Sequence, residues 1–154
     1  MDELFLSFLQ DIPSEYTDFV LELDKYVTSR GSRRTIKAAK SGFVTSYSSP
    51  VTGRALFNYV FRKNGVKMRI YAEHIGEHPE ILCDFPAQMK ADMKKAGDCK
   101  KLTGRTCTPT CPAGYTFLLD GAEYRKCKNT AFFHALEKEN LPYLKKLIEV
   151  ELVF

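Results

Sequence analysis

The fold of this chain is decided by residues 55–71, ALFNYVFRKNGVKMRIY. Aromatic and β-branched residues dominate both halves of the stretch, which is typical of strands. Between the halves lies Lys63-Asn64-Gly65, and an Asn-Gly pair is a common sequence in the tight turn of a β-hairpin. We therefore predict two antiparallel strands, one from Ala55 to Arg62 and one from Val66 to Tyr71.

Patterns on either side of this hairpin extend it into a mixed fold. Further strands are expected at residues 36–39, 43–47 and 131–136. Helices are expected at residues 4–9, 14–29, 79–85 and 86–96 and from residue 140 onward. Runs of strands between terminal helices indicate an α+β fold. We expect N-terminal helices, a central antiparallel sheet, and further helices, including a C-terminal helix, packed on that sheet.

Length and composition suit one globular domain. The chain has 154 residues, of which 44% are hydrophobic and 27% are charged, so it can bury a single core. We assign residues 1–154 to one domain, in which residues 99–127 form a cysteine-containing hairpin subregion. Residues 1–5 lack the basic segment and cleavage site of a secretory signal. No apolar run approaches the roughly 18 residues of a membrane span. A cytoplasmic protein is therefore expected.

Positive charge is concentrated in the predicted sheet. The net charge is +4, yet residues 29–72 hold ten basic residues and no acidic one, while residues 1–28 are acidic. Side chains alternate between the two faces of a strand, so one face of the 55–71 hairpin can share Asn58, Arg62, Lys67, Arg69 and Tyr71. Such a face would suit an anionic ligand or a nucleic-acid backbone. The alternative is a solvated sheet face without a ligand.

The cysteines are also concentrated. Four of the five are Cys99, Cys107, Cys111 and Cys127. The segment between the last two predicts a second hairpin, because Asp120-Gly121 favours a type I′ turn. In that register Cys127 returns to the neighbourhood of Cys111, and the four thiols can converge.

Converging thiols in a cytoplasmic protein indicate metal binding or redox chemistry, since stable disulfides are rare there. Our preferred interpretation is a structural zinc site with four cysteine ligands. An iron–sulfur cluster uses the same ligands, a redox pair would use Cys107 and Cys111, and unreactive thiols are the remaining alternative. Cys83 lies in an apolar stretch and is expected in the core.

Signals for catalysis are weak. His74 and His78 have the i, i+4 spacing of a metal pair, but Gly76 and Pro79 argue against one continuous helix. The chain has no G-x-S-x-G sequence and no P-loop. We expect a small binding or adaptor module rather than an enzyme, stabilised by zinc. The alternatives are a binder of nucleic acid or anionic ligands and a thiol redox sensor.

Several segments carry a resemblance to a known group. They are Lys40-Ser41-Gly42-Phe43-Val44, Phe61-Arg62-Lys63-Asn64-Gly65, Arg69-Ile70-Tyr71, Cys99-Lys100-Lys101-Leu102 and Gly114-Tyr115-Thr116-Phe117. Over residues 8–152 the chain resembles a family of uncharacterised proteins from clostridia and related bacteria. Its layout is also similar to the YdhG-like and YjbR-like small α+β domains, from which the cysteine-containing segment is a departure. The resemblance implies a bacterial protein with this fold and implies no catalytic residues.

Overall fold

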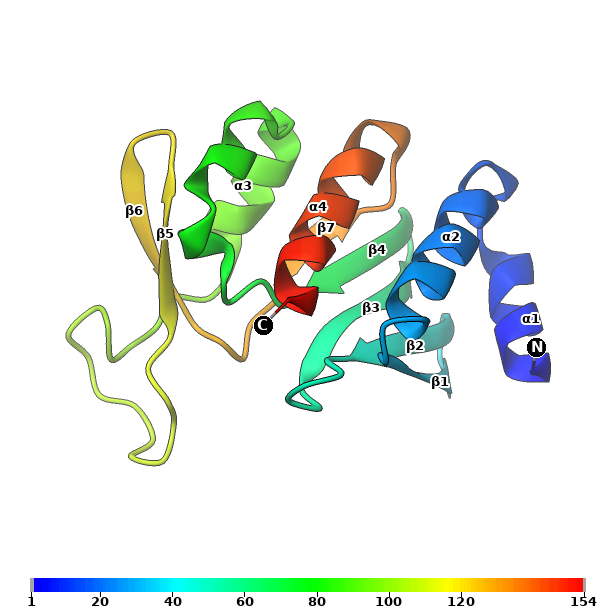
Figure 1. Cartoon of the computed structure of the whole chain (residues 1–154), viewed down its shortest axis with the longest axis horizontal. Helices are drawn as coiled ribbons and strands as arrows, with labels where there is room; N and C mark the ends of the chain where they lie inside the picture. Colours follow the sequence, from blue (N-terminus) through cyan, green and yellow to red (C-terminus); the bar gives the residue numbers. More distant parts are fainter. Residues whose placement is uncertain (1, 154) are drawn as a thin grey trace.

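The computed structural model describes residues 2–153 and has a five-stranded antiparallel sheet at its centre (Figure 1). The sheet order is β1-β2-β3-β4-β7. Its strands are β1 (Arg33–Ala39), β2 (Gly42–Ser48), β3 (Ala55–Arg62), β4 (Gly65–Ile70) and β7 (Phe132–Ala135). The hairpin predicted from residues 55–71 is confirmed, with Asn58 opposite Arg69 and Arg62 opposite Gly65. The α+β class is thus confirmed.

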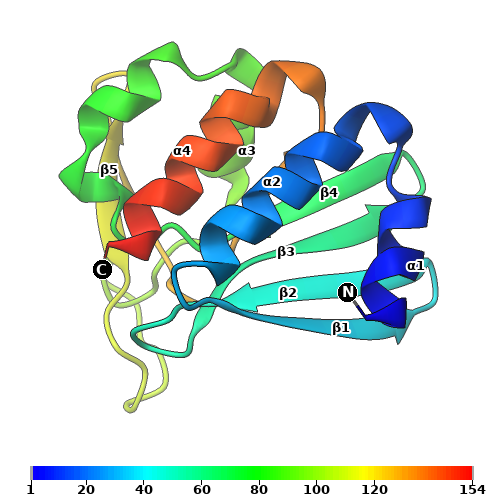
Figure 2. The same ribbon diagram turned by 45° about the vertical axis from the view of Figure 1, so that its right-hand side comes forward.

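The helices gather on one side of this sheet, as Figure 2 shows for α1, α2 and α4. They are α1 (Glu3–Asp11), α2 (Thr17–Thr28), α3 (Ala87–Lys95) and α4 (Leu141–Leu152). Helix α1 begins after Asp2, whose carboxylate accepts a hydrogen bond from the Phe5 N–H at 2.7 Å. A carboxylate in this position satisfies a backbone donor that the helix leaves without a partner. Helix α4 has Pro142 in its first turn, where the missing N–H costs nothing.

The core lies between these helices and one face of the sheet. Phe57, Tyr59 and Met68 are fully buried on that face. The Tyr47 ring stacks on Phe57 with 4.5 Å between centroids. Offset aromatic pairs of this kind stabilise a core beyond the area that they bury. The alternation of buried and accessible residues along β4 is the pattern expected of a sheet with one covered face.

Arg34 joins the acidic N-terminal helices to the edge of the sheet. Its guanidinium donates to Asp24 at 2.7 Å and to Asp2 at 3.2 Å, and it lies 3.8 Å from the centre of the Phe5 ring. The Asp24 carboxylate also accepts a hydrogen bond from the Tyr47 hydroxyl at 2.7 Å. Arg34 therefore differs from the other strand cations, because its charge is neutralised on the helix-covered face.

The second predicted hairpin is also confirmed and forms a separate two-stranded sheet. Strand β5 (Tyr115–Leu119) pairs with β6 (Ala122–Lys126), and Phe117 lies opposite Tyr124. Asp120 and Gly121 have φ of 51° and 83°, as a type I′ turn requires. The buried ammonium of Lys126 attaches the hairpin to the end of α3, because it donates to the carbonyl oxygens of Lys94 and Ala96, each at 2.8 Å.

Two details differ from the sequence-based expectation. Residues Ser14–Tyr16 form a 3-10 turn before α2, and Pro79–Asp84 is a 3-10 helix. The prediction that Cys83 belongs to the core is wrong, because Cys83 is exposed. In this 3-10 segment Leu82 is the buried residue, so the neighbouring Cys83 points outward.

Within residues 2–153, no helix has both the length and the apolar character needed to cross a bilayer.

Candidate functional site

The face of the sheet opposite the helices carries the most distinctive group of side chains. Backbone pairing places five cations on it: Arg33, Lys37, Arg62, Lys67 and Arg69. We call this surface, together with Asn58 and Phe133, the open sheet face. In the part of the chain that the structure describes, none of its five cations forms an ion pair with a carboxylate. Its cations therefore remain available to an anion from solution.

One row of the open sheet face crosses all five strands. The residues that lie opposite one another are Thr35, Ser46, Asn58, Arg69 and Phe133. From one edge of the sheet to the other, this row offers two hydroxyls, an amide, a guanidinium and an aromatic ring. With about 4.8 Å between strands, the row is about 19 Å long.

Phe133 was not predicted as a site residue, although it is an exposed aromatic side chain of the face. Its side chain is 37% exposed on the edge strand β7. The guanidinium carbons of Arg62 and Arg69 lie 5.7 and 5.9 Å from the centre of its ring. These distances lie within the range of cation–π attraction. The expected strand at residues 131–136 could have indicated this, because side chains alternate along a strand. Phe132 and His134 are buried, and Phe133 points the other way.

Asn58 is the buried polar group of the same row. It is only 8% exposed, and its side-chain oxygen has no hydrogen-bond partner. A buried acceptor without a donor is unfavourable by an amount comparable to a lost hydrogen bond. Asn58 thus holds a buried acceptor without a partner, in a row where its cross-strand neighbours are Ser46 and Arg69.

Tyr71 lies away from the other predicted ligand residues. Its backbone N–H donates to the Leu56 carbonyl at 3.0 Å, just beyond the end of β4. Its side chain lines a pocket of about 300 Å³ with Arg54, Ala55, Lys128 and Asn129. Asn58, Arg62, Lys67 and Arg69 therefore share one face, while Tyr71 belongs to the end of the sheet.

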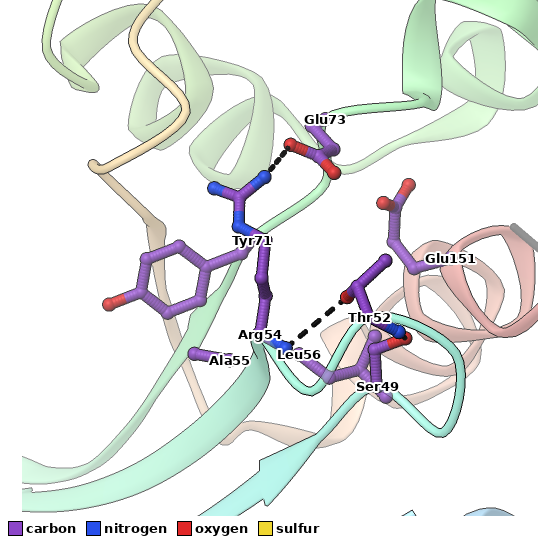
Figure 3. A pocket seen from close by; sticks show the side chains of 8 residues that line it. All are labelled: Ser49, Thr52, Arg54, Ala55, Leu56, Tyr71, Glu73 and Glu151. Carbon is purple, nitrogen blue, oxygen red and sulfur yellow. Dashed lines mark hydrogen bonds and ion pairs between the residues drawn. The ribbon is translucent and has the colours of Figure 1, made fainter. Parts of the chain in front are cut away.

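A second polar cluster lies at that end (Figure 3). Arg54 donates to Glu73 at 2.7 Å, and both line a cavity of about 20 Å³ with Glu151. A cavity of this size holds about one water molecule. Glu151 accepts from His74 twice, from Nδ1 at 2.9 Å and from the backbone N–H at 3.0 Å.

Glu151 is the buried acid of this cluster, and Arg54 is the cation that pairs with Glu73. Glu151 is only 5% exposed, and burial raises the pKa of its carboxyl although the hydrogen bonds from His74 act in the opposite direction. Within residues 2–153, one group of three histidine, cysteine or acidic residues has all its ligand atoms within 4.8 Å of one another. It consists of Glu73, His74 and Glu151. His78 does not belong to it, and its Nδ1 lies 3.4 Å from Oε1 of Glu80. Because Arg54 already neutralises Glu73, we interpret the cluster as an ion-pair network that closes this end of the sheet.

The four clustered cysteines have unequal surroundings. Cys99 is buried, and its sulfur accepts a hydrogen bond from the Gly114 N–H at 3.2 Å. Burial opposes ionisation of this thiol, but the N–H groups of Leu102, Gly114 and Lys101 outweigh it and hold the thiol pKa below its ordinary value. The Cys127 sulfur accepts from the Asn129 N–H at 3.4 Å. Hydrogen bonds of this kind stabilise thiolates.

Cys107 and Cys111 lie on the segment that precedes β5. Cys107 is exposed and Cys111 is half-buried. Burial raises the pKa of the Cys111 thiol, and so does the hydrogen bond to the neighbouring Cys107. In the described residues, however, the four sulfurs do not form a closed tetrad at coordination distance. The donor types fit zinc, whereas their arrangement is not that of a completed site.

Comparisons with known proteins do not place the chain in a family. No family model, no curated protein and no solved structure matches it.

Proposed function

We propose that this protein is a binding module that holds a polyanion, nucleic acid foremost, on the open sheet face. The observation that carries the proposal is five cations without ion-pair partners on a sheet face that no described helix covers. Phosphate groups supply the complementary charge, and their binding is favoured by release of the counterions that surround a nucleic acid.

The expected salt dependence follows from the number of cations. For a single strand, the slope of log affinity against log salt is about −0.7 for each phosphate neutralised. Five neutralised phosphates would give a slope of about −3.5, which is about a 100-fold loss of affinity between 50 and 200 mM salt. A ligand held mainly by apolar contacts would not show this loss.

Charge reversal on the face tests the proposal. The double variant Lys67→Glu with Arg69→Glu should lose binding to a labelled oligonucleotide in fluorescence anisotropy at low salt. The matched control is Lys94→Glu with Lys95→Glu, which makes the same change in net charge on exposed residues of α3. The control should retain most of the affinity, because α3 lies on the helix-covered side, where Asp92 contacts the buried His134 of β7. A parent protein that binds neither oligonucleotide nor polyphosphate at low salt would refute the proposal.

A second proposal concerns zinc bound by Cys99, Cys107, Cys111 and Cys127. The N–H groups of Gly114 and Asn129 favour it, because they already donate to two of the four sulfurs. Bound zinc would stabilise the fold of this subregion. The unfolded chain does not contain the assembled site, so the free energy of zinc binding adds to the stability of the folded state.

Metal analysis of the purified protein tests the zinc proposal. About one equivalent of zinc is expected. Cys111→Ser should lower that content, whereas Cys83→Ser should not, because Cys83 lies on the exposed side of a different segment. Metal-free protein whose stability is unchanged by a chelator would exclude the zinc site. It would leave a thiol redox sensor or unreactive thiols as the explanation of the cysteines.

A further inference from the structure

We infer that the open sheet face takes single-stranded nucleic acid laid across the strands, with one base stacked on Phe133 and one polar group bonded to Asn58. This inference rests on the proposed function and specifies its ligand. The five-strand row supplies the path: Arg69 lies directly between Asn58 and Phe133, and all three point to the same side. A ligand that contacts the aromatic ring and the amide must therefore pass over a guanidinium, which suits a phosphate between two nucleosides.

Phe133 decides between a single strand and a duplex. Its ring is an exposed aromatic group on a face whose other apolar side chains, Val44, Val60 and Ala135, are smaller, and it lies at the edge of the sheet. Bases stack on such rings without regard to sequence, because every base has a π-face. In a duplex both faces of each internal base are already covered by neighbouring bases. Away from the ends of a duplex, only an unpaired base can cover this ring.

Asn58 adds a specific contact. Its unpartnered oxygen is buried, so it can accept a hydrogen bond from the amino or imino group of a base or from a ribose 2′-hydroxyl only when the side chains over it move aside. Satisfying a buried acceptor is more favourable than making a new bond at the surface, since the acceptor has already lost its water.

The experiment compares four probes of similar length in fluorescence anisotropy or competition at 50 mM salt. They are a mixed-sequence single-stranded oligonucleotide, the same strand with abasic sites, its duplex, and inorganic polyphosphate. The parent protein should bind the intact strand at least several-fold more tightly than the other three. The variant Phe133→Leu keeps an apolar side chain but removes the π-face, and it should weaken binding of the intact strand about 10-fold. Its affinity for polyphosphate should not change.

Leu118→Ala is the matched control, because Leu118 is also exposed but lies on the separate β5–β6 hairpin. It should bind all four probes as the parent does. Asn58→Ala should weaken binding of the intact strand several-fold, because it removes the acceptor that the free protein leaves unsatisfied.

The outcomes distinguish a failure of the proposed function from a failure of the single-strand inference. If the parent binds no probe, the proposed function itself fails. If polyphosphate and the abasic strand bind as tightly as the intact strand, and Phe133→Leu has no effect, the face is a general polyanion site and the single-strand inference is overturned. Tighter binding of the duplex than of the intact strand would overturn it as well.

Discussion

Gly114 is the position at which a single methyl group should do the most damage to the cysteine-containing subregion. A Cβ atom there would lie 2.0 Å from the Lys126 carbonyl oxygen and 2.8 Å from the Cys99 Cβ. The neighbouring backbone cannot yield easily, because the Cys99 N–H donates to the Arg125 carbonyl and the Cys127 N–H donates to the Gly97 carbonyl. Gly114→Ala must therefore separate two segments that are hydrogen-bonded to each other.

The magnitude follows from two losses. Overpacking a closed site costs about 1–3 kcal/mol, and weakening the bond from the Gly114 N–H to the Cys99 sulfur costs about 1 kcal/mol. The sum is about 2–4 kcal/mol of unfolding free energy. With a urea m value of about 2 kcal/mol/M, the midpoint should fall by about 1–2 M.

Equilibrium urea unfolding under reducing conditions measures this shift. Tyrosine fluorescence and circular dichroism are suitable because the chain has 8 tyrosines and no tryptophan. Gly53→Ala is the control, since Gly53 has φ of 74° but nothing within 4 Å of the added methyl. Its cost should be about 1–2 kcal/mol, from backbone strain alone. If Gly114→Ala unfolds at the same midpoint as the parent or as Gly53→Ala, the close approach of Gly114 to Lys126 and Cys99 is refuted.

Three other substitutions have defined outcomes. Gly121→Val should lower stability by about 1–2 kcal/mol in urea unfolding, because a β-branched residue resists the positive φ of this turn; unchanged stability would contradict the type I′ turn. Tyr59→Phe should leave the melting temperature equal or higher, because the buried hydroxyl has no partner; a marked fall would reveal a partner for it. Asp2→Ala should lower the melting temperature more at pH 6 than near pH 2. The hydrogen bond from Phe5 lowers the pKa of Asp2 below 3.8, so its contribution is present above that pH and is lost as the pH falls through the folded-state pKa. A difference between parent and variant that is equally large at pH 6 and near pH 2 would contradict this reasoning.

Local structure was largely determined by the sequence. The Asn64-Gly65 and Asp120-Gly121 pairs identified both hairpins, because few residues other than glycine tolerate the positive φ that these turns need. The alternation along β3 and β4 was enough to place Asn58, Arg62, Lys67 and Arg69 on one face. These features depend on residues close together in the chain, for which backbone sterics and the two-residue period of a strand are sufficient reasons.

Features that depend on distant residues were decided by the tertiary structure. Glu151 meets His74 from 77 positions away, and no local pattern encodes such a contact. Phe133 became part of the open sheet face only because β7 pairs with β4, which places Phe133 opposite Arg69.

Burial was decided in the same way. The sequence placed Cys83 in the core, yet the 3-10 geometry of its segment exposes it. Asn58 reads as an ordinary surface residue, yet it is enclosed by neighbours from two other strands. In regular strands, sequence patterns determine which way a side chain points, but packing between elements determines what it meets there. A binding site depends on the second of these, because its ligand contacts residues that are brought together from different strands.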